Sequence, residues 1–152
     1  MKEKKDAVDD ALNSTRHAAR DGYVPGGGVA LLRTQDAIMN LAKRAKGDEK
    51  IGFDIVAKAV ESCVKQIADN AGHDGDLVVE KIKEGGKGGN AFGFNAATGE
   101  YTDLVKDGII DPALVAKTAL INAASVAGLM LTTDVLITEL KEDKKPVEGA
   151  VA

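Results

Sequence analysis

Residues 111–131, DPALVAKTALINAASVAGLML, decide the fold class of this 152-residue chain. Asp111 followed by Pro112 is a strong helix start, because Asp can cap the first turn and Pro suits the first helical position. The residues that follow are apolar or small, and alanines recur at spacings that let a neighbouring helix come close. We therefore predict a helix from Ala113 to about Leu131. It forms either part of the core or an oligomer surface, and the core is favoured.

Helical periodicity continues upstream of this segment. Apolar residues recur with a period near 3.6 in three long segments and one short segment, which we predict as helices: residues 3–21, 28–45, 49–71 and 77–83. Gly22 is the expected stop of the first helix, and Asp76 is the expected cap of the last. The pattern is typical of a mainly α protein.

Two segments favour strands instead of helices. Residues 92–94, FGF, are short and aromatic, and residues 95–100 have the composition of a turn, with Gly99 supplying a permissive backbone. Residues 134–140, DVLITEL, alternate apolar with polar side chains, so we predict a strand there. That strand needs a partner: the Phe92 region, a neighbouring chain or a segment that this chain lacks. The predicted architecture is a mainly helical domain with a small β-hairpin or strand element.

Composition argues against several classes of function. The formal net charge of -4 and the pI of about 5.2 argue against a nucleic-acid binder. No window approaches about 18 consecutive apolar residues, and the N-terminus lacks the apolar core of a signal peptide, so we expect no membrane span. One cysteine and two histidines make a Cys/His zinc site unexpected. The single cysteine favours a reducing, cytoplasmic compartment.

Several residues could carry chemistry, and each has a plain structural alternative. The glycines of PGGGVA, residues 25–30, could present backbone N–H groups to a phosphate, but a tight turn between two helices is favoured. Asp10 lies opposite the apolar face of its helix, where it is either solvated or directed at a ligand or a partner, with solvation favoured. A capping role is enough to explain Asp111, and a turn is enough to explain Asn95.

The remaining reactive side chains have no chemical partners in the sequence. His17 and His73 lie in polar surroundings and are expected at the surface. Cys63 lies on the apolar side of its predicted helix, where a small hydrophobe is favoured over a nucleophile. Composition, period and spacing alone therefore indicate a soluble, mostly helical domain that is part of something larger.

Four segments together resemble one family closely. They are residues 1–33, MKEKKDAVDDALNSTRHAARDGYVPGGGVALLR; 92–101, FGFNAATGEY; 107–120, DGIIDPALVAKTAL; and 123–137, AASVAGLMLTTDVLI. In this order they are similar to the group I chaperonins, the GroEL type of bacteria, mitochondria and chloroplasts. The resemblance covers nearly the whole chain and implies part of an ATP-dependent protein-folding chaperonin.

The resemblance also implies that the chain matches only the C-terminal part of a much longer subunit. Residues 1–21 would be an intermediate-domain helix, and residues 22–140 the C-terminal half of the equatorial, ATP-binding domain. Residues 141–152 would be a flexible tail. The substrate-binding apical domain, the phosphate loop and the magnesium-binding carboxylate of the family have no counterpart in this sequence.

The resemblance assigns the base of the nucleotide to one group of residues. The family's Asn-Ala-Ala turn lines the adenine pocket, which points to Asn95, Ala96 and Ala97. Ile109 would be an apolar wall against the base. Gly27, the middle glycine of the Gly-Gly-Gly turn, would approach the nucleotide. Small residues and a few hydrogen bonds suit a flat aromatic ligand.

Two carboxylates complete the implied site. Asp111 would contact the ribose, and Asp10 would position or deprotonate the attacking water once its helix swings down in the closed state. The implied cofactor is ATP with Mg²⁺ and K⁺, whose ligands would lie in the missing half, so we expect no metal ligand here. The chain alone is expected to have no useful ATPase activity.

The implied partners are other subunits of a double-ring homo-oligomer, a co-chaperonin lid and unfolded client proteins. The alternative is a non-enzymatic helical assembly module that self-associates without nucleotide.

Overall fold

A computed structural model describes residues 2–85 and 89–138 of the chain. Its helices are α1 (Lys2–Asp21), α2 (Val29–Arg33), α3 (Gln35–Ala42), α4 (Asp48–Ala59), α5 (Ser62–Asn70), α6 (Gly75–Glu84) and α7 (Ala113–Leu131). Its strands are β1 (Tyr23–Pro25), β2 (Phe92–Asn95), β3 (Glu100–Asp103) and β4 (Ile110–Pro112). The prediction of a mainly helical fold with a small β element is therefore confirmed.

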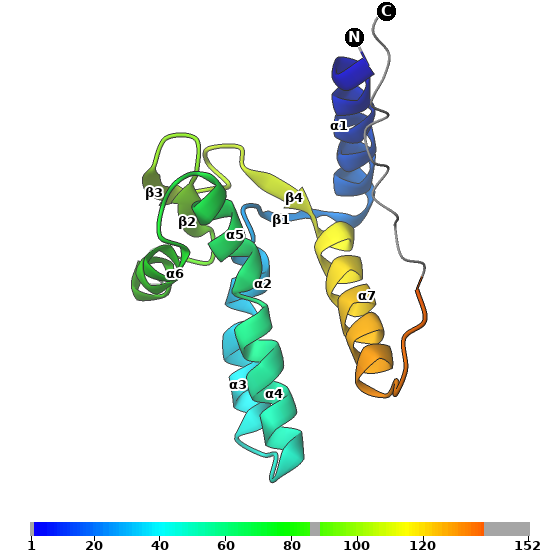
Figure 1. Cartoon of the computed structure of the whole chain (residues 1–152). Helices are drawn as coiled ribbons and strands as arrows, with labels where there is room; N and C mark the ends of the chain where they lie inside the picture. The colour runs from blue at the N-terminus through cyan, green and yellow to red at the C-terminus, as the bar shows by residue number, and fades with distance from the viewer. Residues whose placement is uncertain (1, 86–88, 139–152) are drawn as a thin grey trace, which may run out of the picture.

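The strands form two separate antiparallel pairs. In the first pair, β2 and β3 make a hairpin in which Phe94 lies opposite Tyr101. In the second pair, β1 lies along β4, and Val24 is opposite Asp111. Figure 1 shows β1 and β4 running side by side between a body formed by α2, α5, α6 and the hairpin, and a second body formed by α1 and α7. The α3–α4 pair projects away from the first body.

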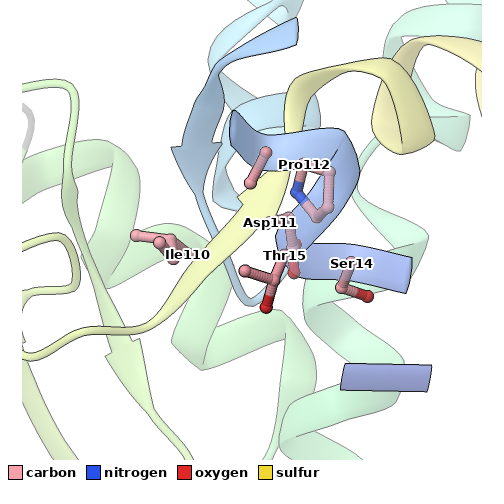
Figure 2. A pocket seen from close by; sticks show the side chains of 6 residues that line it. Ser14, Thr15, Ile110, Asp111 and Pro112 are labelled. Carbon is pink, nitrogen blue, oxygen red and sulfur yellow. The ribbon is translucent and has the colours of Figure 1, made fainter. Parts of the chain in front are cut away.

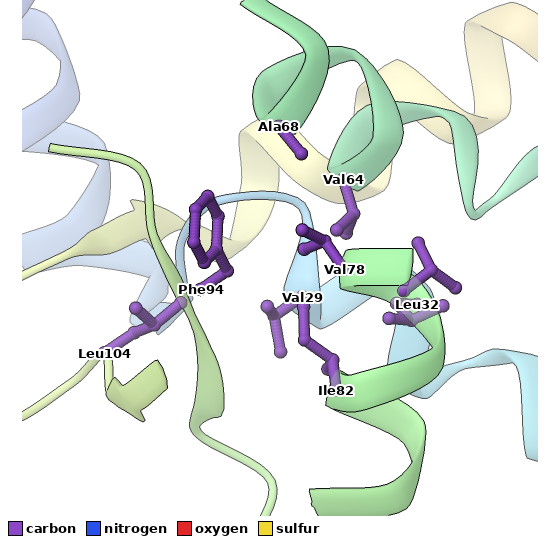
Figure 3. Packing of buried hydrophobic residues seen from close by; sticks show 9 residues of the cluster. Val29, Leu32, Val64, Ala68, Val78, Ile82, Phe94 and Leu104 are labelled. Carbon is purple, nitrogen blue, oxygen red and sulfur yellow. The ribbon is translucent and has the colours of Figure 1, made fainter. Parts of the chain in front are cut away.

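The core lies in the first body. Its buried apolar side chains come from α2, α5, α6 and the β2–β3 hairpin (Figure 3), and they are Val29, Leu32, Val64, Ala68, Val78, Val79, Ile82, Phe94 and Leu104. Ile82 and Leu104 are both 0% exposed. Burying aliphatic side chains of this kind is the main stabilising contribution to the fold. This core holds the segments on either side of the glycine turn and the Asn95 turn in fixed positions.

Two predicted long helices are each interrupted once. The helix expected over 28–45 divides at Thr34, whose hydroxyl donates to the carbonyl of Leu31 at 2.6 Å. The helix expected over 49–71 divides at Val60 and Glu61, where the hydroxyl of Ser62 donates to the carbonyl of Ala59 at 2.7 Å. Such side-chain bonds to preceding carbonyls compete with the helical ladder and bend it.

Two predicted caps are wrong. Asp74 caps α6, not Asp76: the carboxylate of Asp74 accepts the backbone N–H groups of Asp76 and Leu77 at 3.0 and 3.1 Å. Asp111 does not cap α7, because it lies in β4 and pairs with Val24. The residue before α7 is Pro112, which makes no side-chain cap. Strand pairing therefore takes precedence over capping at Asp111.

The predicted strand 134–140 is also wrong over the part that the structure describes. Residues 134–138 are in no strand, and residues 139 and 140 lie outside the described residues, as does the predicted tail 141–152. An alternating sequence forms a strand only when a neighbour accepts its backbone hydrogen bonds. Within the described ranges no segment pairs with 134–138.

The prediction that the helix 113–131 belongs to the core is wrong for this chain. None of the residues in α7 is buried, and the side chains of Leu129 and Met130 are 70% and 69% exposed. On α1 the predicted apolar face is likewise open, with Val8 65% exposed.

By length and composition alone, α7 could also cross a membrane, but a single helix of this kind is weak evidence for a membrane span. An apolar helix without cover indicates a surface that another molecule or segment meets.

Candidate functional site

The glycine turn connects β1 to α2 and needs two left-handed residues. Gly27 and Gly28 have φ angles of 63° and 77°, which side chains disfavour. A Cβ atom on Gly28 would lie 2.9 Å from the Cβ of Cys63, so α5 packs directly against the turn. At Gly27 the nearest atoms to such a Cβ are Leu104 Cδ1 at 3.6 Å and the Phe94 carbonyl at 3.9 Å. A tight turn is therefore present, but it connects strand β1 to helix α2 and not two helices, and Gly27 faces the β2–β3 hairpin.

The Asn95 turn joins β2 to β3 and is held by its own hydrogen bonds. The Asn95 side-chain oxygen accepts the backbone N–H of Ala97 at 3.0 Å, and its carbonyl accepts the N–H of Gly99 at 2.8 Å. These bonds form the Asx-type turn that Asn favours. Ala96 packs against the core cluster, whereas Ala97 is exposed.

The segment before α7 brings the other predicted residues to these turns. Ile109 is partly buried against the core, and its backbone N–H donates to the carbonyl of Leu104 at 2.8 Å. Its carbonyl accepts the N–H of Gly26 at 3.0 Å. Ile109 therefore lies beside the glycine turn, and Gly27 in that turn faces the end of β2. Residues far apart in sequence thus converge on one part of the core.

Asp111 lies two residues after Ile109 in extended backbone, in which alternate side chains share a face. Asp111 is exposed by surface area, but partial burial raises the pKa of its carboxyl. It lines a hollow of about 150 Å³ with Ser14, Thr15 and Ala18 of α1, and Figure 2 shows it beside Ser14 and Thr15.

A second, more apolar hollow of about 280 Å³ lies between the first body and α7. Asp111 is its only carboxylate, and its other lining residues are Gly28, Ala30, Leu31, Cys63, Ile67, Val115, Ala116 and Ala119. Asp111 is thus at the junction of α1, α7 and the glycine turn. A single partly desolvated carboxylate in a mostly apolar lining suits a ligand that bears a hydroxyl group.

Asp10 is not brought into this group. It lies exposed on α1, one turn before Ser14, at a rise of about 6 Å along the helix. No hydrogen bond or ion pair of Asp10 occurs within residues 2–85 and 89–138. Asp10 is therefore on the same helix that covers Asp111, but at a distance from the converged turns.

The described part of the chain holds no group of three or more His, Cys, Asp or Glu side chains that could bind a metal ion.

One charged cluster, around Glu61, was not predicted from the sequence. Glu61 on the α4–α5 junction accepts hydrogen bonds from Lys83 at 2.6 Å and Gln35 at 2.7 Å, and it pairs with Lys65 at 3.0 Å. Only the spacing of Glu61 and Lys65, four residues apart, signals it locally.

The β1–β4 pair was also missed, although it positions the site. The segment Tyr23–Pro25 gives no strand signal, because it is short and contains a proline. Its partner, Ile110–Pro112, lies far away in the sequence. Only the structure shows that these segments meet.

A comparison with protein families matches residues 1–141 to the TCP-1/cpn60 chaperonin family. The match covers most of the chain, including α1, both turns and α7. The chain belongs to this family of chaperonins.

Proposed function

We propose that this chain carries the adenosine side of the nucleotide site of a group I, GroEL-type chaperonin subunit. The observation that supports this most is the convergence of three segments on one part of the core: the glycine turn, the Asn95 turn and residues 109–111. Gly27, Asn95, Ala96 and Ile109 lie together there, and Asp111 follows Ile109. These are residues that the family resemblance assigns to the nucleotide.

The chemistry of these residues suits adenosine. Ala96 and Ile109 offer small and apolar contacts to a base, and the Asn95 turn offers backbone polar groups at its edge. Asp111 would accept a hydrogen bond from a ribose hydroxyl. Since partial burial already raises the pKa of its carboxyl, a hydroxyl donor would compensate the lost solvation.

Asp10 would act only after a movement of α1. Its exposed carboxylate on the helix that covers Asp111 could reach a nucleotide's γ-phosphate if α1 swings over the site, where it would orient the attacking water. The phosphate-binding groups and the Mg²⁺ and K⁺ ligands would come from other parts of the subunit. The chain alone would bind ATP weakly or not at all and hydrolyse none.

In the whole subunit the proposed activity is ATP-driven protein folding in the cytoplasm. Its partners would be identical subunits in a double ring, a co-chaperonin lid and unfolded client proteins. None of these contacts uses nucleic acid or a membrane.

The test is a calorimetric titration of the full 152-residue chain with Mg-ATP at millimolar concentration. Asp111→Ala should abolish any binding seen with the unchanged chain, and Asp107→Ala should not, because Asp107 is an exposed carboxylate of the preceding loop. Equal binding by both variants would contradict the assignment of Asp111. No binding by the unchanged chain would mean that the phosphate half is indispensable.

A second candidate function is self-association without nucleotide, and the open surface of α7 favours it. That helix is mostly apolar, with Lys117 as its one charged residue, and it has no buried residue. A helix with this composition is normally covered. Sedimentation velocity with and without Mg-ATP separates the two candidates: a stable oligomer that ignores nucleotide would support an assembly module.

A further inference from the structure

His73 lies in the turn between α5 and α6, and its backbone is fixed on both sides. Its N–H donates to the carbonyl of Ala68 at 2.9 Å, which closes the end of α5. The next residue, Asp74, caps α6 through two hydrogen bonds. The Cα of His73 is therefore held by the helical body, although its side chain is at the surface.

The His73 ring is directed at the β2–β3 hairpin. It meets the ring of Phe94 edge-on, with ring centroids 5.0 Å apart and an angle of 74°. Its Nε2 atom is 3.7 Å from the place where a Cβ of Gly99 would be. Phe94 precedes the Asn95 turn and Gly99 ends it. The ring thus contacts Phe94 before the turn and lies close to Gly99 at its end.

The contact with Phe94 is part of a larger aromatic cluster. The Phe94 and Tyr101 ring centroids are 5.2 Å apart, and those of Phe92 and Tyr101 are 6.3 Å apart. Three of the five Phe and Tyr residues of the whole chain are therefore gathered on this hairpin. His73 is the member of the cluster that comes from the α5–α6 turn, so it connects the hairpin to the helical body.

We propose that His73 is a positioning residue for the Asn95–Gly99 turn. The strands on either side have four residues each, and a two-stranded hairpin of this kind is marginally stable without packing against other elements. Phe94 and Ala96 anchor one side of the turn in the core. The His73 ring packs on Phe94 and lies close to the other side of the turn at Gly99. The consequence for a bound base rests on the proposed function, in which this turn lines the adenine pocket.

The experiment uses the full chain and three variants. His73→Ala removes the ring, His73→Phe keeps a ring of similar size, and Asn70→Ala is the control. Asn70 lies at the end of α5, where its side chain bonds only Gln66 among the described residues. Two properties are measured: amide hydrogen exchange at residues 97–99 without nucleotide, and the dissociation constants of Mg-ATP and Mg-ITP, which differ in the base.

We expect His73→Ala to speed exchange at residues 97–99 by about fivefold, the order expected for losing one aromatic contact. The preference for ATP over ITP should fall by a similar factor, and His73→Phe should restore both. Asn70→Ala should change neither. Preference for the base is a readout that general destabilisation would not move.

Unchanged exchange in His73→Ala, or equal behaviour of the Ala and Phe variants, would overturn the proposal. If the unchanged chain binds neither nucleotide, the phosphate half of the site is indispensable for binding, and the base preference has to be measured in the whole subunit. The exchange measurement still decides the role of His73, because it needs no nucleotide.

Discussion

The backbone N–H of Gly26 donates to the carbonyl of Ile109 at 3.0 Å, and this bond continues the β1–β4 pair into the glycine turn. A Cβ on Gly26 would lie 3.1 Å from Ile109 Cγ2, so the two backbones approach closely. The bond joins residues 83 positions apart by number (109 minus 26). The bond ties the glycine turn, which contains Gly27, to the segment that carries Asp111. The position of Gly27 and the position of Asp111 therefore depend on each other.

Substitution of Gly28 by Ala should test how tightly this turn is packed. The new Cβ would meet Cys63 Cβ at 2.9 Å at a φ of 77°, so we expect a loss of about 2–4 kcal/mol from strain and overlap together. Gly22→Ala is the matched control, because its φ is 84° but nothing lies within 4 Å. It should cost only about 1–2 kcal/mol. Urea unfolding of both variants measures the difference, and equal losses would contradict the close packing of α5 on the turn.

Substitution of Ile82 by Ala should show that the first body contains the main core. Ile82 is 0% exposed, and its truncation leaves a cavity, so we expect a loss of about 2–5 kcal/mol. Ile55, which is 62% exposed on α4, is the control, and Ile55→Ala should change stability by less than about 0.5 kcal/mol. The measurement is the midpoint of urea unfolding. A lower midpoint, with no change in how steeply the unfolding free energy falls with urea, shows a loss of stability. Similar losses at both positions would mean that α4 is covered in solution.

The helices were predictable because their signals are local. Periodicity located α1 within one residue of its start, and Gly22 ends it with a φ of 84° and a bond to the carbonyl of Ala18. The interruptions at Thr34 and Glu61 were not predicted, because Ser, Thr and Glu also occur inside continuous helices. Only the hydroxyl bonds of Thr34 and Ser62 to preceding carbonyls in the folded chain show the breaks.

The strand pairs and caps were not predictable for the opposite reason. Asp111-Pro112 has the sequence of a helix cap, and nothing near it signals that Val24 will pair with it. The predicted strand 134–140 has a good local pattern, but residues 134–138 have no partner within the described ranges. A local strand pattern therefore forms a strand only where a partner segment lies beside it, and a local cap signal fails where a strand partner competes.

The candidate site could be predicted only through the family resemblance. Spacing gives no reason to join Gly27 with Asn95 or Ile109, and the structure brings them together by long-range packing. The functional roles of these residues, and that of Asp10, stay predictions. The hollow beside Asp111 and the contact of His73 with the turn have no signal in the sequence at all.

The acid stability of the chain should depend on Glu61. Burial alone would raise the pKa of this carboxyl, but hydrogen bonds from Lys83, Gln35 and Lys65 outweigh burial and lower it to about 2. Because the folded pKa is below the ordinary value of 4.5, the stabilisation is fully present above about pH 4.5 and is lost as the pH falls toward 2. Its size is on the order of 1–3 kcal/mol.

Glu61→Gln should remove this part of the pH dependence and lower stability at neutral pH. Glu80→Gln is the control, since Glu80 is exposed and has no ion pair in the part of the chain that the structure describes. Urea midpoints measured from pH 7 to pH 3 give the comparison. If the urea midpoint of Glu61→Gln depends on pH as strongly as that of the unchanged chain, solvent screens the cluster more than its geometry indicates.

The surface of α7 should control whether the chain associates. Val115, Val126 and Met130 fall on one side of the helix by spacing and are 50%, 58% and 69% exposed. This side continues from the hollow that Asp111 and Val115 line. Burying this apolar surface against a partner would stabilise the complex by about 25 cal/mol for each Å² removed from water. We therefore expect the unchanged chain to form oligomers whose population rises with concentration.

Val126→Glu should shift the chain toward the monomer, because a carboxylate in such an interface must be desolvated without a partner. Asn70→Glu adds the same charge at an exposed polar position on α5 and should leave association unchanged. Sedimentation velocity over a hundredfold range of concentration measures both. If the unchanged chain stays monomeric throughout, α7 does not drive self-association, and the open surface is instead one that a different molecule covers. If both variants dissociate equally, net charge controls association rather than α7.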